Sequence, residues 1–451
     1  MELYSLPFQD GHLIYRPLLG IAFAGNAAMV NLLTRLQDGP VAPRSSAENR
    51  ALSLLEAAGF LRPDPEPERE PARRAPYRPT VAVLCMTTAC NLRCVYCYAC
   101  GGETAPRHLP VELGRRAIDT VCRNARDSGA EHFRLEFHGG GEPTLAALSL
   151  RALVAHARTR ESPCQVSVTT NGCWTKATRK WLLAHVDHVS LSLDGTREVQ
   201  NRQRPDAGGG ATFRRVLESA RALDQHGVSY GIRMTVTDDS IAHLPAGIDL
   251  LTRRTCCGVF QAEPAFDCGR ARDAGLSLSL HQRFAEAFLE AWDIAASRGR
   301  HLYYSGARPG IITRRFCGAA SKALIVTPEG SLTACYEVCS PDHPLAGMFF
   351  MGKLGPLGPR TEEHARRSFE DALYRSRARC AGCFCYWHCA GDCPSKVLAA
   401  DGFTAPPWSP RCELNRLITR ELLVRYAHAA GGVWRLSAQP HAAPHVEGNC
   451  R

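Results

Sequence analysis

Cysteine is the residue that most constrains what this chain can fold into, because 21 of its 451 residues are cysteines. The first 13 residues contain neither a basic stretch nor an apolar stretch, so we expect no signal peptide and a cytoplasmic protein. Cytoplasmic thiols stay reduced, which disfavours a disulfide framework and leaves metal ligands or buried thiols. The spacing of the cysteines decides between these two uses.

One short loop contains three closely spaced cysteines. It reads Cys90-x3-Cys94-x2-Cys97 and follows a predicted strand at 81–85. Three thiolates in one loop can bind three irons of a [4Fe–4S] cluster and leave the fourth iron open for another ligand. A zinc site needs four ligands, and Cys100 or Cys85 can supply the fourth. The spacing favours the cluster and leaves zinc as the alternative.

Strand-like and helix-like segments alternate between residues 80 and 270. The predicted strands are 81–85, 133–137, 166–169, 189–193, 230–236 and 259–262. Helical patterns occur at 111–127, 176–185, 212–226 and 241–251. Repeated strand–helix units predict an α/β fold with a parallel sheet, whose functional side chains lie at the carboxyl ends of the strands.

Residues 1–62 are predicted to form a small separate unit. Asp10-Gly11 indicates a hairpin, and Asn26 and Ser45 are predicted to cap two helices. Glu48 completes a capping box with Ser45. A hairpin with short helices is a winged-helix-like arrangement.

The other segments differ in pattern. Residues 63–79 are rich in proline and charge, which is typical of a linker. A long amphipathic helix is expected at 276–298. Beyond 310 we expect irregular, cysteine-rich structure, and 437–451 reads as a tail without pattern.

The run CNLRCVYC at 90–97 closely resembles the radical S-adenosylmethionine superfamily. Three later strand ends agree with this resemblance: GGEP at 140–143, VTTNG at 168–172 and SLSLDG at 190–195. The resemblance implies a partial (β/α)6 barrel over 80–300. It also implies a [4Fe–4S] cluster on Cys90, Cys94 and Cys97 with S-adenosylmethionine on the open iron. In that family, reductive cleavage of this ligand yields a 5′-deoxyadenosyl radical that abstracts hydrogen. The residues that the resemblance assigns to ligand binding are Tyr96, Gly140, Gly141, Glu142, Pro143, Ser192 and Arg204, with Arg233 a weaker candidate.

Seven of the cysteines beyond residue 310 resemble the SPASM extension of radical S-adenosylmethionine enzymes. The resemblance implies an auxiliary-cluster domain over 301–436 with two further [4Fe–4S] clusters. One set of ligands is Cys380, Cys383, Cys389 and Cys412. The other set is Cys317, Cys335 and Cys393, with its fourth iron open or bound by Cys339. A structural zinc array is the alternative.

SPASM proteins resemble one another in acting on peptides or proteins. The expected function is therefore maturation of a ribosomally made precursor peptide by hydrogen abstraction. The product is a thioether, carbon–carbon or carbon–oxygen cross-link, with epimerisation left open. The unit at 1–62 resembles the leader-recognition domains of such enzymes, which bind a leader peptide as an added strand. The expected partners are this precursor with its leader and an electron donor such as flavodoxin or ferredoxin.

Two other functions remain as alternatives. Anaerobic sulfatase-maturating enzymes resemble this chain, but they carry Asp where Tyr336 stands and usually Gln where His138 stands. A neutral phenol is a poor general base at neutral pH, so formylglycine formation is disfavoured. A non-catalytic iron–sulfur carrier or scaffold is the other alternative. Tyr336 and Glu337, which follow a cluster cysteine, are the candidate catalytic residues for handling a proton or radical.

Charge and hydropathy exclude other partners. The net charge is +10, but no dense basic run with interleaved aromatic residues occurs, so we expect no nucleic-acid binding. No apolar run approaches the roughly 20 residues that a membrane helix requires, so we expect no membrane association.

Overall fold

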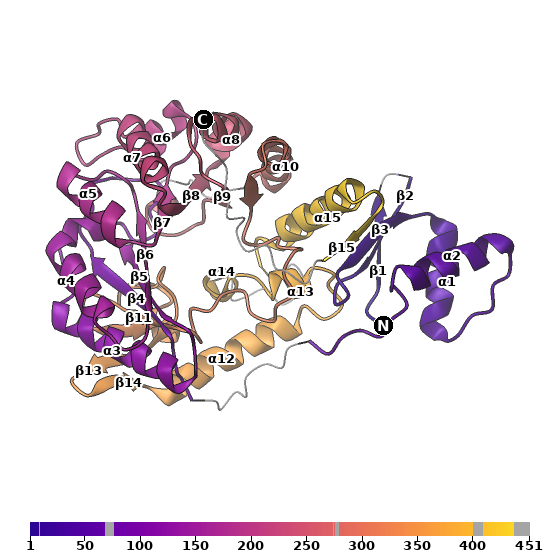
Figure 1. Ribbon diagram of the computed structural model, residues 1–451, viewed down its shortest axis with the longest axis horizontal. Helices are drawn as coiled ribbons and strands as arrows, with labels where there is room; N and C mark the ends of the chain where they lie inside the picture. The colour runs from indigo at the N-terminus through magenta and orange to yellow at the C-terminus, as the bar shows by residue number, and fades with distance from the viewer. Residues whose placement is uncertain (9, 68–75, 274, 276–278, 400–408, 437–451) are drawn as a thin grey trace.

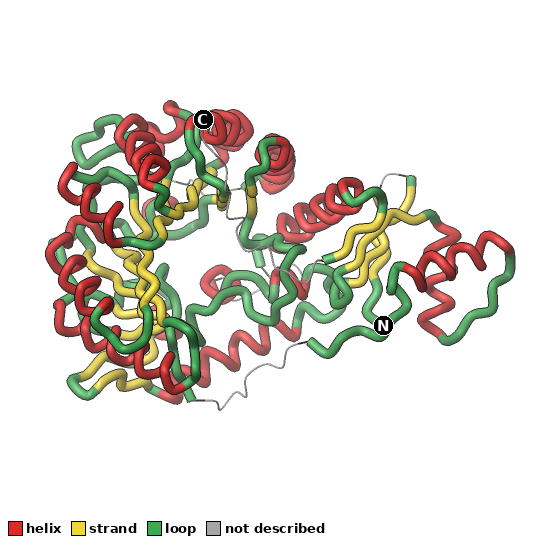
Figure 2. The backbone as a smooth tube through the Cα atoms, in the orientation of Figure 1, coloured by secondary structure: helices red, strands yellow, loops and turns green. Residues whose placement is uncertain are grey.

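The computed structural model describes the whole chain except residues 9, 68–75, 274, 276–278, 400–408 and 437–451. The described residues form a four-stranded sheet and an eleven-stranded sheet. In Figure 1 the large sheet curves beneath an outer layer of helices at the left, and the small sheet lies at the right beside two helices. Elements of the last third of the chain lie between them (Figure 2).

The N-terminal unit is an antiparallel sheet in the order β1-β2-β3-β15 with two helices on one face. Its elements are β1 (Tyr4–Phe8), β2 (Gly11–Arg16), β3 (Ile21–Gly25), α1 (Ala27–Asp38), α2 (Ser46–Ala57) and β15 (Val433–Arg435). The predicted hairpin and both helices are confirmed. The Asn26 and Ser45 side chains accept hydrogen bonds from the backbone N–H groups of Met29 and Glu48.

Two features of this unit differ from expectation. The Glu48 carboxylate bonds Arg35 and the Arg44 backbone N–H, so the capping box is only half formed. Strands β3 and β15 were not predicted. β15 pairs with β3, so a segment more than 400 residues away in the chain completes the sheet.

Strands β4 to β9 are parallel, and each is followed by helical structure, which confirms the predicted (β/α)6 arrangement. The strands are β4 (Val81–Thr87), β5 (Phe133–Gly140), β6 (Cys164–Thr170), β7 (His188–Ser192), β8 (Ser229–Val236) and β9 (Val259–Pro264). The helical segments are α3 (Val111–Asp127), η1 (Pro143–Ala146), α4 (Ala147–Arg158), α5 (Lys176–His185), α6 (Arg197–Gln203), α7 (Phe213–His226), η2 (Asp238–His243), α8 (Leu244–Arg254), α9 (Arg270–Asp273) and α10 (His281–Ser297). The sheet stays open, with β10 (His301–Tyr303) and β14 (Gly358–Thr361) at its edges.

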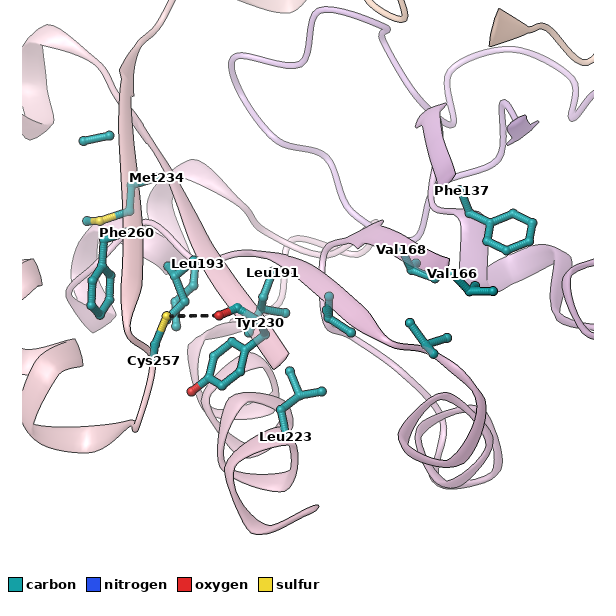
Figure 3. Packing of buried hydrophobic residues seen from close by; sticks show 14 of the residues in the cluster. Phe137, Val166, Val168, Leu191, Leu193, Leu223, Tyr230, Met234, Cys257 and Phe260 are labelled. Atoms are coloured by element: carbon teal, nitrogen blue, oxygen red, sulfur yellow. Dashed lines mark hydrogen bonds between the residues drawn. The ribbon is translucent and has the colours of Figure 1, made fainter. Parts of the chain in front are cut away.

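Alternate side chains of each strand pack under the outer helices. On β8 these include Ile232 and Met234, and on β5 they include Leu135 and Phe137. Figure 3 shows part of this apolar layer, including Phe137, Tyr230 and Phe260. The intervening residues of each strand face the inner side of the curved sheet, which is mostly polar apart from a small apolar cluster around Val83, Cys85 and Ile325.

The two helix predictions over 241–251 and 276–298 need correction. The first begins as the 3-10 turn η2 and restarts as α8, because Pro245 fits only the first turn of a helix. The second is α10, which begins at His281. Residues 276–278 lie outside the described chain. So do residues 68–75 of the predicted linker and the whole predicted tail at 437–451.

The expectation of irregular structure beyond residue 310 is wrong. Helices α12 and α15 span 16 and 18 residues there. The elements are β11 (Ala323–Val326), β12 (Ser331–Thr333), α11 (Ala346–Phe349), β13 (Phe350–Gly355), β14, α12 (Glu363–Ala378), α13 (Tyr386–Cys389), α14 (Pro394–Ala399) and α15 (Cys412–Ala429). Charged residues dominate α12, so its narrow apolar side left little periodic signal. Of the helices in the described parts of the chain, none is long and apolar enough to cross a bilayer.

Candidate functional site

The loop with Cys90, Cys94 and Cys97 leaves the carboxyl end of β4 and is bonded to distant segments. The backbone N–H groups of Arg93 and Val95 donate to the carbonyls of Pro205 and Gln203, at 2.8 and 2.9 Å. The Arg93 side chain also donates to the carbonyls of Cys90 and Gly102, at 2.9 and 2.8 Å. The protein itself therefore shapes this loop.

The glycine-rich turn after β5 packs directly against the cysteine loop. A Cβ atom on Gly141 would lie 1.9 Å from the Ala89 carbonyl oxygen, so only glycine fits there. Gly140 has a φ of +74°, a conformation that glycine adopts without strain. The Glu142 N–H donates to the Ala89 carbonyl at 2.8 Å. These contacts explain why the GGEP turn requires its glycines, whatever ligand binds above it. Pro143, the last residue of the motif, begins the 3-10 turn η1.

The Glu142 carboxylate is buried and already extensively hydrogen-bonded. Its Oε1 accepts from the hydroxyls of Thr144 and Thr170, at 2.6 and 2.7 Å, and from the Thr144 N–H. Its Oε2 accepts from the Asn171 N–H at 2.8 Å. Burial raises the pKa of Glu142, and these hydrogen bonds oppose that effect. Remaining acceptor capacity for a ligand ammonium group is therefore at Oε2.

The end of β6 also holds the cysteine loop. Asn171 Nδ2 donates to Asn91 Oδ1 at 2.7 Å and lies 4.0 Å from the Cys90 sulfur. Asn91 Nδ2 donates in turn to the Cys173 carbonyl at 3.1 Å. The VTTNG motif thus supplies an amide bridge between the third strand of the barrel and the loop.

Tyr96 and Arg204 meet at a buried carboxylate, that of Asp194. Asp194 Oδ2 accepts hydrogen bonds from the Tyr96 hydroxyl and from Arg204 Nε, the latter at 3.1 Å. The Arg204 guanidinium lies 5.3 Å from the Tyr96 ring centroid and 3.9 Å from the Cys94 sulfur. Burial acts to lower the pKa of Arg204, but the charge of Asp194 raises it well above its ordinary value. Arg204 is therefore a fixed cation beside Cys94. Ser192 lies at the carboxyl end of β7.

Sequence reasoning missed two residues of this site. Asp194 was visible in the SLSLDG motif, but nothing in that motif marked it as the partner of Tyr96. Arg270, on α9, donates to the carbonyls of Cys94 and Gly101 and forms an ion pair with Glu103. No sequence signal linked Arg270 to a loop about 170 positions earlier.

The structure gathers the cysteines of the C-terminal array into two sets. The thiol of Cys335 interacts electrostatically with those of Cys317 and Cys393, and burial raises its pKa well above the ordinary range. The other set comprises Cys380, Cys383, Cys389 and Cys412, in which burial and the neighbouring thiols raise the pKa of Cys380 to about 12. These are the two predicted ligand sets.

Neither set has the arrangement of a site for a single metal ion. Within the described residues, no three cysteine, histidine or acidic side chains converge on one point as the ligands of one metal ion do. In a [4Fe–4S] cluster each thiolate binds a different iron, so its ligands surround the cluster. Cys339 forms a hydrogen bond with Cys85, which lies on the inner face of β4. Cys85 is close enough to Cys335 to interact with it electrostatically.

Tyr336 and Glu337 lie over the inner face of the large sheet. The Tyr336 ring is 4.3 Å from the His138 ring, and its pKa is raised by burial. Glu337 Oε2 accepts from Lys396 Nζ at 2.8 Å and from the Ser395 hydroxyl at 2.9 Å. Burial acts to raise the pKa of Glu337, but the charge and hydrogen bond of Lys396 lower it to about 2. Burial and the charge of Arg233 lower the pKa of His138 to about 3.

A buried polar network joins the C-terminal array to the barrel. Arg411 Nε lies 3.2 Å from both carboxylate oxygens of Asp392, and Arg411 also pairs with Glu263 of β9 at 3.4 Å. Asn415 Nδ2 donates to the Cys389 sulfur at 3.3 Å, and its Oδ1 accepts from the Tyr304 hydroxyl at 2.7 Å. The Arg411 link begins next to cysteines of the C-terminal array, the Asn415 link begins at Cys389, and both end on the barrel.

The N-terminal sheet packs on the loop that carries Cys383 and Cys389. The Tyr15 hydroxyl hydrogen-bonds His388, and Trp387 Nε1 donates to Glu2 at 2.8 Å. Tyr4 contacts Phe384 edge to face, with ring centroids 6.4 Å apart. This unit is therefore fixed to the cysteine-rich C-terminal region.

Comparisons with known proteins agree with this arrangement. The family model of the radical SAM superfamily matches residues 84–247. The serine-type anaerobic sulfatase-maturating enzyme of Klebsiella aerogenes is 27% identical over 335 residues, 69% of this chain and 78% of the relative. The mycofactocin maturase MftC of Mycobacterium tuberculosis is 26% identical over 335 residues, 71% of this chain and 79% of the relative.

Solved structures share the fold. Native anSMEcpe with bound AdoMet has a TM-score of 0.61 at 19% identity and covers 78% of this chain and 100% of its own. SuiB of Streptococcus suis bound to S-adenosylmethionine has a TM-score of 0.52 at 13% identity and covers 89% of this chain and 96% of its own. The match over residues 84–247 shows a radical SAM domain in this part of the chain, and that family implies a [4Fe–4S] cluster and S-adenosylmethionine.

Proposed function

We propose that this protein is a peptide maturase that forms a cross-link in a ribosomally made precursor. The observation that carries the proposal is the position of Tyr336, which directly follows Cys335 of the C-terminal array and packs on the inner face of the barrel, opposite His138. A cluster on the first loop and S-adenosylmethionine together supply a hydrogen-abstracting radical. Two auxiliary clusters in the C-terminal array give the electrons of an oxidative cross-link a path away.

The protein's own residues have three tasks in this proposal. Cys90, Cys94 and Cys97 hold the first cluster, and the oriented backbone of the 140–143 turn, Ser192 and Arg204 position S-adenosylmethionine. Arg204 is kept charged by Asp194, as fits contact with a ligand carboxylate. Tyr336, whose pKa is raised, stays a neutral phenol that can pass a hydrogen atom or proton to or from the substrate.

The N-terminal unit is proposed to bind the leader part of the precursor as an added strand. β15, of three residues, covers β3 and forms one edge of the described sheet, and β1, of five residues, forms the other edge. SuiB, with a similar fold, has been solved bound to its precursor peptide SuiA. An external one-electron donor such as flavodoxin or ferredoxin completes the proposed system.

Formylglycine formation is the second candidate, because sulfatase-maturating enzymes are among the relatives. The side chains near Tyr336 disfavour it. Glu337 is held by Lys396 and Ser395, and the lowered pKa of His138 keeps the imidazole neutral but weakly basic. Neither group is a strong base poised for the deprotonation that oxidation to an aldehyde requires.

Co-expression tests the function. Short open reading frames that neighbour the gene are sought and expressed with the enzyme under anaerobic conditions, and their products are analysed by mass spectrometry. A cross-link predicts a loss of about 2 Da for each bond formed and fragmentation that skips the linked residues. The control is the Cys94→Ala enzyme, which should leave the peptide unmodified. Formylglycine at a cysteine or serine, or no change in mass, would contradict the proposal.

A further inference from the structure

The inner face of the large sheet carries a cation without a bonded partner. Arg233 lies on β8 between Ile232 and Met234, which pack under the outer helices, so its side chain belongs to the opposite, inner face. In the sheet register it pairs with Ser192 on β7 and Gln261 on β9. Arg233 is half-buried, and its side chain makes no hydrogen bond or ion pair with any residue that the structure describes.

The other charged side chains around it are already engaged. Glu337 is held by Lys396 and Ser395. Glu263 accepts from the backbone N–H and the hydroxyl of Ser305, at 2.8 and 2.9 Å, and pairs with Arg411.

Arg134, an arginine on the same face, is paired with Glu136 at 2.8 Å. It contributes to a cavity of about 450 Å³ that reaches Tyr336. Arg233 thus differs from Arg134 in having five N–H donors that no protein acceptor uses.

Three side chains share the surroundings of Arg233. The charge of Arg233 acts on His138 and on Tyr336, whose rings are 4.3 Å apart, and the hydroxyl-bearing ring of Tyr98 lies close enough to act on Arg233. His138 Nδ1 is buried and has no hydrogen-bond partner among the described residues. A buried polar group without a partner is rare in proteins, so His138 Nδ1 and the half-buried guanidinium of Arg233 are both available to a polar ligand.

The chemistry of that ligand follows from the guanidinium. Its planar fork matches a carboxylate with two parallel hydrogen bonds, and the pairing is strong where water is scarce. S-adenosylmethionine also has a carboxylate, but the arginine proposed to bind it is Arg204, which lies 3.9 Å from the Cys94 sulfur. The groups around Arg233 come instead from His138 and from residues 335–337.

We propose that Arg233 binds a carboxylate of the peptide substrate, with His138 Nδ1 available for a second polar contact. This inference rests on the proposed peptide maturase function. It makes an aspartate, a glutamate or a C-terminal carboxylate part of the sequence that the enzyme prefers next to the position of hydrogen abstraction.

Two short peptides test the inference without knowledge of the precursor. They are acetyl-Ala-Ala-Asp-Ala-Ala-amide and its asparagine counterpart, each deuterated at the β-carbon of the central residue. The reconstituted enzyme is supplied with dithionite and S-adenosylmethionine, and deuterium in 5′-deoxyadenosine is measured by mass spectrometry. A C–D bond of the peptide breaks, a C–D bond forms at the 5′ carbon, and the unpaired electron remains on the peptide. We expect deuterium transfer from the aspartate peptide to exceed that from the asparagine peptide by about tenfold or more, because one charge-assisted pair contributes about that factor.

Variants separate the possible outcomes. Arg233→Met should remove the preference for aspartate, and Arg233→Lys, which keeps the charge but loses the fork, should retain part of it. The matched control is Arg134→Met, an inner-face arginine that already has a partner, and it should keep the preference. Iron content and circular dichroism report correct folding of each variant.

Two results would overturn the inference. One is equal transfer from the two peptides in the wild-type enzyme, including none from either. The other is weaker binding of S-adenosylmethionine to Arg233→Met in equilibrium dialysis, which would assign the guanidinium to the cofactor. Failure of the wild-type enzyme to form any 5′-deoxyadenosine is distinct, because it would contradict the proposed function itself.

Discussion

The two cysteine regions of this protein are built in different ways. The backbone around Cys90, Cys94 and Cys97 is hydrogen-bonded to residues 203–207, and Arg270 and Asn171 reach it from two other strand–helix units. Among the described residues 380–393, backbone bonds are local, with the contact between Thr313 N–H and the Trp387 carbonyl as an exception. The first region is thus shaped by the barrel, whereas the second depends on its side chains and on the clusters that it is proposed to hold.

This difference suits two different tasks. A loop that presents an open iron to a ligand must hold the same shape with and without that ligand, and a preorganised backbone achieves this. An array that encloses its clusters can fold around them, because metal binding then contributes directly to folding.

Removal of iron is expected to reveal the largest difference between the two cysteine regions. Chelation under anaerobic conditions is expected to leave hydrogen exchange slow over 88–102, because protein hydrogen bonds hold that loop. Exchange over 380–393 should accelerate by roughly 100-fold or more, because the cluster ligation that joins its segments is lost. Hydrogen–deuterium exchange with mass spectrometry, applied to chelated and reconstituted protein, measures both segments at once. Equal loss of protection in the two segments would contradict the distinction.

Arg411→Met tests the side-chain network that supports the array. It leaves the buried Asp392 carboxylate without its cation, and we expect a loss of about 3–5 kcal/mol in stability. The matched control, Arg425→Met, lies on the same helix but breaks the exposed pair with Asp293, with an expected cost of about 1 kcal/mol or less. Midpoints of anaerobic thermal unfolding compare the two. Similar shifts for both variants would show that the buried network does not support the array.

Asn415→Leu should have the smallest effect, on the electronic properties of one cluster. The Tyr304 hydroxyl orients the amide so that Nδ2 donates to the Cys389 sulfur. Hydrogen bonds to cluster sulfurs favour the reduced state, so the variant should have a more negative reduction potential. A bond of about 1 kcal/mol corresponds to roughly 40 mV for one electron.

A redox titration followed by electron paramagnetic resonance measures this potential. Asn124→Leu is the control, because Asn124 is a half-buried amide that donates to the Pro79 carbonyl on the outer side of the barrel. Its potentials should match those of the wild type. An unchanged or more positive potential in Asn415→Leu would count against the role of this amide.

Much of the barrel could be predicted from the sequence. Helices at 111–127 and 176–185 have the expected bounds, because their apolar residues recur at the helical period. The strands are alternating or apolar segments between turn signals, and their ends lie within a few residues of expectation. The cysteine spacing likewise indicated the first loop, since ligands in a short loop are necessarily close in space, whereas the two C-terminal sets followed from the resemblance to the SPASM extension.

Other features depend on contacts between distant segments, which no local pattern records. The strand β15 acquires its conformation by pairing with β3, and α12 is defined by a narrow buried side. Asp194, Arg270 and Asn415 each act on a cysteine loop from another part of the chain.

The sequence by itself therefore determined the barrel, the radical SAM loop and the cysteines that can bind clusters, because these follow from periodicity and short spacing. Only the tertiary structure decided what surrounds them. It paired Glu337 with Lys396 and placed His138 against Tyr336. It also left the Arg233 side chain on the inner face without a hydrogen-bond or ion-pair partner among the described residues. The physical reason is that charge pairing and burial depend on which side chains meet in space, and that is settled when the chain packs.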